Sequence, residues 1–348
     1  MPQCSGRLFK ELTSLVSTTI TLPTRLNGSA DAEVLHLRAD EAVDLHLHTY
    51  ASDGFWDPTV LVSHLADHGF RVAAVCDHDT QDSVVEAIEA GARRGVLIVP
   101  ATEVTVRWGE RQWHLLVYGI RPDDERVDTK AFLDLMRDQD ARFRALAVDA
   151  RRRVEVSGRP LPSIDKHVNG RTMMPVHVLR TMIAEKHVLS LKEAAELVVE
   201  LGGHFTTDSR LEEVVEVAHQ GGGVCVLAHP GRADLGPALT GDTLDQILAE
   251  TPLDGIEAHY RSYTDDETTF YRGLAEERGL LIGAGSDSHA PGAPVDPRPW
   301  RAIWAADLLG RLGITVDPLA AGEPVWESGM DPLAVKPEPA KEPATVEA

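Results

Sequence analysis

Histidines and carboxylates recur in this chain at places where the sequence predicts that strands end. His46 and His48 flank one leucine at the end of the apolar run 42–47, so the two-residue period of a strand points both imidazoles to one side. One His-x-His triplet is a weak signal in a chain with 15 histidines, and a polar strand end is the alternative interpretation. Similar side chains, however, follow the predicted strands throughout: Asp53, Asp77, His78, Glu103, His229, Asp287 and His289.

These side chains predict a metal site. The carboxyl ends of the strands in a parallel barrel meet at one rim, so we expect the groups to lie together. Imidazole with carboxylate is a ligand set for Zn, Mn or Fe, and the lack of cysteine thiolates favours an open catalytic site over a closed structural zinc site. A carboxylate can bridge two ions, and ions about 3.5 to 4 Å apart hold the attacking and leaving oxygens of an in-line displacement. Phosphoryl transfer is the chemistry that fits.

Strands and helices alternate along much of the chain, which is typical of an α/β barrel. We expect strands at residues 42–47, 72–76, 97–100, 113–119, 223–228, 255–258 and 280–284. Helices are expected at residues 58–68, 83–94, 211–219, 243–250 and 265–278.

The expected domain organisation follows from these patterns. A barrel in two parts, 41–120 and 206–325, is interrupted by a charged helical insertion at 121–205 that covers one end of the barrel. Residues 1–40 form an N-terminal extension without a clear period, and the tail 326–348, dominated by Pro, Lys, Glu and Ala, is expected to be disordered.

The composition limits the partners. The net charge of -21 disfavours long nucleic acid, because such binding depends on neutralising phosphates with Lys and Arg. A small phosphate ester remains compatible, since bound metal ions set the local field of a cleft. No signal peptide or membrane-spanning run is evident, and Cys4, Cys76 and Cys225 show no paired spacing, so we expect a cytoplasmic protein without a membrane partner. The oligomeric state is left open.

Six motifs in order resemble the polymerase and histidinol phosphatase (PHP) family of metal-dependent phosphoesterases, over residues 43–292. The matching stretches are Asp44-Leu-His-Leu-His-Thr49 with Ser52-Asp-Gly54, Val75-Cys-Asp-His-Asp-Thr80, Ile98-Val-Pro-Ala-Thr-Glu103, Trp113-His-Leu-Leu-Val-Tyr-Gly119, Val226-Leu-Ala-His-Pro-Gly-Arg232 and Gly285-Ser-Asp-Ser-His289. The resemblance implies a distorted (β/α)7 barrel of the PHP type, which agrees with the strand count, here with a helical insertion.

The resemblance also implies three divalent metal ions, with Mn expected and Fe or Zn as alternatives. The implied ligands of the first ion are His46, His48, Glu103 and Asp287; of the second, Asp53, His78 and His289; and of the third, Glu103 again, His114 and His229. All nine positions are filled, which favours an active enzyme. The expected reaction is attack of a metal-bridging hydroxide on phosphorus.

One branch of the family, which acts on nucleoside monophosphates, 3',5'-nucleotide bisphosphates or short RNA ends, is similar in further residues. The chain shares with it the stretch from Ala228 to Arg232 and the Gly-Ile-Glu triplet that ends at Glu257. That branch usually carries an Arg-Pro-His triplet whose arginine binds phosphate, and here Pro175 takes the place of the arginine. Arg171 is the expected substitute.

Four residues are predicted to assist the reaction or bind the substrate. Arg232 is the expected phosphate clamp, because a guanidinium matches phosphate oxygens in a fork, with a surface arginine as the alternative. Asp77 is expected to orient a ligand imidazole. His177 is expected to protonate the leaving oxygen, and His259 to touch the substrate; for both, a structural histidine is the alternative.

The sequence therefore predicts a metal-dependent phosphatase that acts on a small nucleotide-like phosphate. A phosphodiesterase is an alternative with the same chemistry. A 5'-3' exonuclease on short RNA or DNA ends and a non-catalytic metal-binding PHP module are the alternatives. A C–N hydrolase of the amidohydrolase type also begins with His-x-His, but it usually needs a bridging carbamylated lysine where this chain has Glu103.

Overall fold

One curled sheet organises the chain, seen here in a computed structural model that describes residues 35–206, 209–232 and 236–333. Its strand order is β8-β7-β6-β5-β4-β3-β2-β9. The strands are β2 (Ala42–Leu47), β3 (Phe70–Val75), β4 (Leu97–Trp108), β5 (Arg111–Tyr118), β6 (Val224–Leu227), β7 (Gly255–Tyr260), β8 (Leu281–Gly285) and β9 (Trp300–Arg301). A parallel bridge between Leu47 and Ser288 brings the end of β2 to the segment after β8, so the sheet nearly closes. The predicted α/β barrel is confirmed.

The barrel is less regular than the predicted parallel one. β5 runs antiparallel to both β4 and β6, and β9 runs antiparallel to β2. β4 was expected to end at Pro100 but continues to Trp108, because it pairs over its whole outer half with β5 through a tight turn. Gly109 in that turn has a φ of 59°, which suits a two-residue hairpin connection. The start of β5 therefore lies at the same rim as the carboxyl ends of its parallel neighbours.

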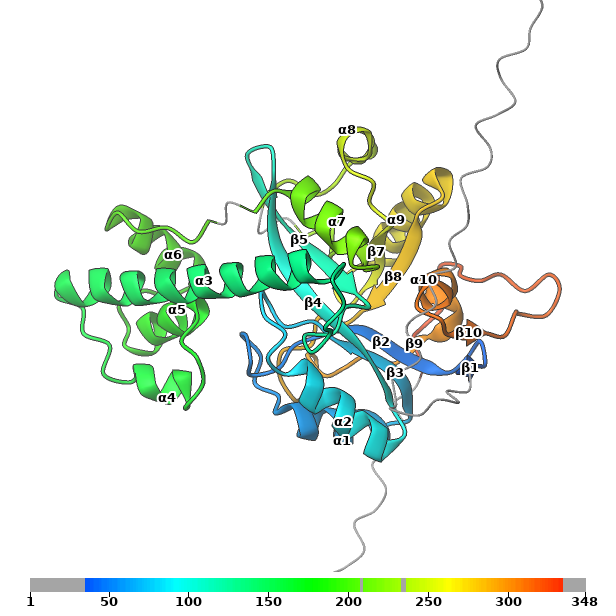
Figure 1. The fold of residues 1–348 in the computed structure, drawn as a ribbon, viewed down its shortest axis with the longest axis horizontal. Helices are drawn as coiled ribbons and strands as arrows, with labels where there is room; N and C mark the ends of the chain where they lie inside the picture. The colour runs from blue at the N-terminus through cyan, green and yellow to red at the C-terminus, as the bar shows by residue number, and fades with distance from the viewer. Residues whose placement is uncertain (1–34, 207–208, 233–235, 334–348) are drawn as a thin grey trace, which may run out of the picture.

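Helices cover the outside of the barrel (Figure 1). They are α1 (Pro58–Asp67), α2 (Val84–Arg94), α7 (Leu211–Gln220), α8 (Gly241–Glu250) and α9 (Asp265–Arg278). Their ends follow local sequence signals: the Asp57 carboxylate accepts from Thr59 and Val60 at the start of α1, and Thr264 with Glu267 forms a capping box at the start of α9. The apolar faces of α1 and α2 pack on β3 and β4, with Leu61 and Leu65 fully buried among them.

A second group of helices projects from the barrel (Figure 1). α3 (Lys130–Val156) begins beside the sheet and extends away from it, and α4 (Ile164–Val168), α5 (Pro175–Ala184) and α6 (Leu191–Glu200) surround its far part. They share their own apolar core, built from residues such as Val154, Val178 and Val198. The Gln139 amide of α3 donates to Asp79 (2.7 Å) and to the carbonyl of Thr105 (2.6 Å), which fixes α3 on the barrel.

Several short elements near the chain ends had no clear sequence signal. β1 (His36–Leu37) pairs in parallel with β10 (Thr315–Val316), and η1 (Ala302–Ala305) leads into α10 (Ala306–Arg311). Residues 1–34 of the predicted N-terminal extension and residues 334–348 of the predicted disordered tail lie outside the described residues. At the last described residue, the amide of Leu333 donates to the carbonyl of Pro299. Within the described ranges, no helix combines the length and apolarity needed to cross a bilayer.

Candidate metal centre

Glu103, in the middle of β4, is surrounded by histidines from four other parts of the barrel. Its carboxylate is fully buried. Oε2 lies 3.0 Å from Nε2 of His46 and 3.1 Å from Nε2 of His48, at the end of β2. Oε1 lies 2.9 Å from Nδ1 of His114 on β5 and 2.8 Å from Nε2 of His229 after β6. One carboxylate thus faces imidazoles on both of its oxygens, as a bridging ligand does.

His78 completes this ring, with Nε2 at 3.4 Å from Glu103 Oε2. It follows β3 and is joined to β4 by a bridge between His78 and Glu103. The expectation that Glu103 follows a short strand is therefore corrected: it lies within a long one, and the neighbouring strand ends bring the histidines to it.

Asp287, after β8, lies on the other side of the β2 histidines. Its Oδ1 is 3.0 Å from Nε2 of His48 and 3.6 Å from Nε2 of His46. His289 follows, with Nε2 at 3.0 Å from Oδ2 of Asp53. All nine predicted ligand positions are thus brought to one rim of the barrel.

The arrangement of these donors fits divalent cations. Nitrogen and oxygen donors form three groups whose atoms lie within 4.8 Å of one another: His48, Asp53, His78 and His289; His46, His48, Glu103 and Asp287; and His78, Glu103 and His114. Nδ1 of His48 is buried, has no hydrogen-bond partner in the described part of the chain, and lies 3.7 Å from Asp53 Oδ1. Nε2 atoms of His46 and His48 also face each other at 3.1 Å. A cation between such lone pairs accounts for both contacts.

These groups differ in detail from the predicted ligand sets. His48 joins both the first and the second group, and in the third group His78 takes the place of His229. His229 still reaches the same carboxylate through Glu103 Oε1.

The charges of the cluster are set by mutual contact. Burial alone raises the pKa of Glu103, but His78, His46 and His114 outweigh it and hold that pKa well below its ordinary value. Burial lowers the pKa of His48, and its contacts with Asp287 and Glu103 reverse this and raise the pKa to about 10. The carboxylates therefore stay ionised and attract positive charge, whether a proton or a metal ion.

The backbone at the rim adopts unusual conformations. His229 has a φ of 27° and Asp287 a φ of 53°, in the left-handed region that L residues rarely adopt. Gly285 lies so close to its neighbours that a Cβ there would overlap the Cβ of His46 and an oxygen of Glu257. The close approach of β8 to β2 therefore requires glycine at this position.

Glu257, on β7, is a functional residue that sequence reasoning did not select. Its buried carboxylate accepts from Nδ1 of His46 (3.1 Å) through Oε1 and from the amide of His229 (2.8 Å) through Oε2. It therefore fixes the ring orientation of one candidate ligand and the backbone of another. The Gly-Ile-Glu triplet was noticed in the sequence only as a family trait.

Tyr260 and Arg232 hold the far oxygen of Asp287. The Tyr260 hydroxyl donates to Asp287 Oδ2 at 2.7 Å, and Nη1 of Arg232 lies 3.2 Å from the same oxygen. The Arg232 side chain is 33% exposed, so the predicted clamp lies at the open side of the cluster. Tyr260 was not predicted.

Asp77 has a different role from the predicted one. Its carboxylate accepts from the amide (2.8 Å) and the hydroxyl (2.6 Å) of Thr49 and from the hydroxyls of Ser52 and Ser83. It therefore holds the turn that carries Asp53, whereas an orienting contact to a ligand imidazole was expected. Being next to His78 in sequence does not place its side chain beside that ring.

Arg171 also serves the loop that carries Asp53. Its guanidinium donates to the backbone carbonyls of Tyr50, Gly54, His167 and Val168. A guanidinium bound to four carbonyls is a brace for the loop, which corrects the expectation that Arg171 binds phosphate.

His177 is buried at the start of α5 and is held neutral. Nδ1 accepts from the amide of Met174 (2.9 Å), so Nε2 carries the proton. Burial, followed by Arg171 and Arg180, lowers its pKa to about 4. At neutral pH it can donate a hydrogen bond from Nε2, but it is not the charged acid that protonation of a leaving oxygen requires.

His259 points away from the cluster. Its ring stacks on Trp304 with centroids 4.5 Å apart, and its Nε2 accepts from Arg272 (2.9 Å). The pairing of β7 with β8 shifts register between Glu257 and His259, so Glu257 and Tyr260 both reach the cluster while His259 does not. The predicted substrate contact is therefore wrong, because the irregularity changes which side chains face the rim.

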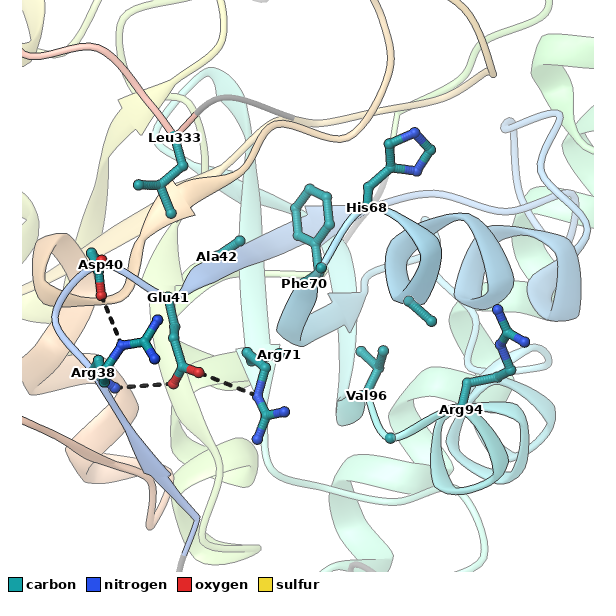
Figure 2. A pocket seen from close by; sticks show the side chains of 13 residues that line it. Arg38, Asp40, Glu41, Ala42, His68, Phe70, Arg71, Arg94, Val96 and Leu333 are labelled. Atoms are coloured by element: carbon teal, nitrogen blue, oxygen red, sulfur yellow. Dashed lines mark hydrogen bonds and ion pairs between the residues drawn. The ribbon is translucent and has the colours of Figure 1, made fainter. Parts of the chain in front are cut away.

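A cavity of about 480 Å³ lies at the opposite end of the barrel, where β2, β3 and β4 begin (Figure 2). Two ion pairs join charged groups of its lining: Arg38 lies 3.2 Å from Asp40, and Arg71 lies 3.7 Å from Glu41. In β/α-barrel enzymes, the end of the barrel at which the strands begin contributes to stability. The paired charges of the cavity give no reason to assign chemistry to this end.

No family model matches the chain. Among curated relatives, the 3',5'-nucleoside bisphosphate phosphatase of Chromobacterium violaceum is 28% identical over 259 residues, which cover 72% of this chain and 88% of the relative. The 5'-3' exoribonuclease Rnm of Escherichia coli is 26% identical over 270 residues, or 75% and 89% of the two chains.

Two solved structures are similar as well. A protein of Bifidobacterium adolescentis assigned as a metal-dependent phosphoesterase has a TM-score of 0.64 and 25% identity, covering 80% of this chain and 97% of its own. An amidohydrolase of Chromobacterium violaceum, solved with bound sulfate and without metal, has a TM-score of 0.60 and 27% identity, covering 73% and 90%. The predicted resemblance to metal-dependent phosphoesterases is thereby confirmed.

Proposed function

We propose that this chain, similar in sequence and fold to metal-dependent phosphoesterases, is itself a hydrolase of small nucleotide-like phosphate esters. The observation that carries the proposal is the cluster around Glu103, in which six histidines and three carboxylates from distant parts of the chain meet at one rim. The likeness to a phosphatase that acts on nucleoside bisphosphates supports the substrate class.

Three divalent ions fit the number of donor groups, and the nine predicted residues are the proposed ligands. Mn is the proposed metal, and Fe or Zn has the same preference for imidazole and carboxylate. When bound, such ions activate water at neutral pH and stabilise charge on phosphoryl oxygens.

The protein's own part is to hold these groups in place. Glu257 keeps the His46 ring in one orientation, and Tyr260 directs Asp287 by occupying its second oxygen. Asp77 and Arg171 fix the loop that ends in Asp53 and Gly54. Prior fixation of this kind lowers the reorganisation that the reaction requires.

Arg232 is the proposed phosphate clamp. It is held against Asp287 by an ion pair and is partly exposed, so phosphate oxygens entering the cluster meet its guanidinium. A fork of N–H donors matches two phosphate oxygens. We propose that His177 donates a hydrogen bond from Nε2 to the leaving oxygen of the substrate, in place of the proton transfer that the sequence predicts.

A 5'-3' exoribonuclease activity on short ends is the second candidate, because relatives from Escherichia coli and Haemophilus influenzae carry that name. The net charge of -21 argues for short substrates over long strands. The amidohydrolase alternative has less support, because the central bridging position is Glu103 and not lysine.

The test combines metal analysis with phosphate release by the purified chain. The panel contains nucleoside 5'-monophosphates, 3',5'-bisphosphates, sugar phosphates and a 5'-phosphorylated RNA trinucleotide. We expect release from nucleotides, and we expect Glu103→Ala and His289→Ala to abolish it while circular dichroism stays native. His204→Ala, at an exposed position on the insertion, is the matched control and should keep wild-type turnover. Full metal loading without turnover on the whole panel would instead indicate a non-catalytic metal-binding module.

A further inference from the structure

Phe55 is an exposed aromatic side chain at the edge of the metal cluster. It is 56% exposed, although both of its chain neighbours, Gly54 and Trp56, are buried. Its amide donates to the carbonyl of His289 at 2.6 Å. Since Phe55 is two residues from Asp53, its Cα lies within about 7 Å of the Asp53 Cα.

Arg180 of α5 covers one face of this ring. Its guanidinium carbon lies 4.6 Å from the ring centroid of Phe55, a cation–π distance. Nη1 also donates to the carbonyl of Asp53 at 2.6 Å. The guanidinium is thus fixed both to the ring and to the loop that carries a candidate ligand. Arg180 lies over one face of the ring, and Phe55 is nevertheless 56% exposed.

We propose that Phe55, backed by Arg180, is a stacking platform for the base of a nucleotide substrate whose phosphate lies at the metal cluster. The proposal rests on the phosphoesterase function proposed above and adds how the substrate is recognised. An aromatic ring accepts any base, because every base has a π face, so the platform selects for nucleotides over base-free sugar phosphates without selecting one base.

The loop contacts make this platform rigid. Arg171 donates to the carbonyl of Gly54, on one side of Phe55, and Tyr50 pairs through its amide with Trp56 on the other. A ring held in one place loses little entropy when a base stacks on it. An exposed aromatic ring on a braced loop next to Asp53 is therefore suited to binding.

The test compares binding and turnover of substrates with and without a base. Full-length wild type, Phe55→Leu, Phe55→Trp, Arg180→Lys and the control Phe270→Leu are loaded with Mn. Phe270 is the matched control because it is 46% exposed and lies on α9. Binding is measured by calorimetry with phosphonate analogues of adenosine 5'-monophosphate and ribose 5-phosphate, whose P–C bond resists hydrolysis. Turnover is measured with the two phosphates themselves.

We expect the ratio of adenosine to ribose affinity to fall about tenfold in Phe55→Leu, in line with the loss of one stacked base. Phe55→Trp should keep or increase the ratio, and Arg180→Lys should lower it about threefold because lysine lacks the planar group that backs the ring. The ratio should not change in Phe270→Leu.

An unchanged affinity ratio in Phe55→Leu overturns the platform, whether or not the wild type hydrolyses either phosphate. A lowered ratio together with no phosphate release from any substrate retains the platform as a binding site and refutes the hydrolase function. The two proposals therefore fail separately.

Discussion

Glu257→Gln is the substitution that isolates positioning of a metal ligand from ligation itself. Glu257 reaches the cluster through His46 and His229: it accepts from His46 Nδ1 at 3.1 Å and from the His229 amide at 2.8 Å. Glutamine keeps the size of the side chain and one oxygen acceptor. Its amide nitrogen cannot accept the second hydrogen bond, and the negative charge that makes His46 a better ligand is lost.

The size of the effect follows from these two contacts. Removal of an outer partner of a metal-bound histidine lowers metal affinity about 10- to 100-fold, or about 1.4 to 2.8 kcal/mol. The unpaired amide of His229 adds a cost of about 1 to 3 kcal/mol to folding, because it remains buried. Because glutamine keeps one acceptor, we expect the loss of metal affinity to be near tenfold, the lower end of that range. We also expect the protein to be modestly less stable.

Metal affinity is measured by titrating the metal-free protein with Mn while free Mn is detected by electron paramagnetic resonance. Stability is measured by unfolding the protein in urea. Glu196→Gln is the control, since Glu196 lies on α6 in an exposed contact of 3.9 Å with Lys192 that contributes little. Wild-type metal affinity in Glu257→Gln, with both proteins folded, would refute the idea that Glu257 positions His46.

Three further substitutions test the surroundings of the cluster. Asp77→Asn should lower Mn stoichiometry and reduce turnover about tenfold, because the Asp53 turn loses a charged acceptor; retention of full stoichiometry by elemental analysis would contradict this. His259→Phe should lower the free energy of unfolding by about 1 to 3 kcal/mol, since buried Arg272 loses an acceptor, and a changed KM would instead return His259 to the substrate site. Gly285→Ala should prevent native metal binding, because its Cβ overlaps His46, and a wild-type melting temperature would show that β8 can move away.

Most of the candidate ligands were predictable from the positions of strand ends, whereas His114 was indicated only by the resemblance to a family. The alternation of side chains in β2 places His46 and His48 together, and the order of strands in a barrel brings the other groups to the same rim. Glu103 was found for a partly wrong reason, since it lies inside β4 and not beyond its end. The pattern was still informative because β4 passes through the rim before turning into β5.

The second layer of the site was not predictable from spacing. Whether Asp77 or Glu257 supports a ligand depends on the direction of its side chain, which spacing along the sequence does not determine. His259 was misplaced because a register shift in β7 has no sequence signal of its own. Arg171 and Arg180 both lie on the insertion and both donate to carbonyls of the Asp53 loop, and the sequence does not show that only Arg180 lies over Phe55.

The central position of Glu103 has a consequence for how the protein would respond to metal supply. Ions held by side chains from β2, β4, β5 and the segments after β6 and β8 would tie together pieces up to 243 positions apart, from His46 to His289. Such ions would bind the assembled barrel in preference to the unfolded chain, and at a free concentration a hundred times the dissociation constant each would contribute about 2.7 kcal/mol to the stability of the barrel. Scarcity of metal would then shorten the lifetime of the polypeptide in the cell as well as silence its chemistry, because the loosened barrel is open to proteolysis.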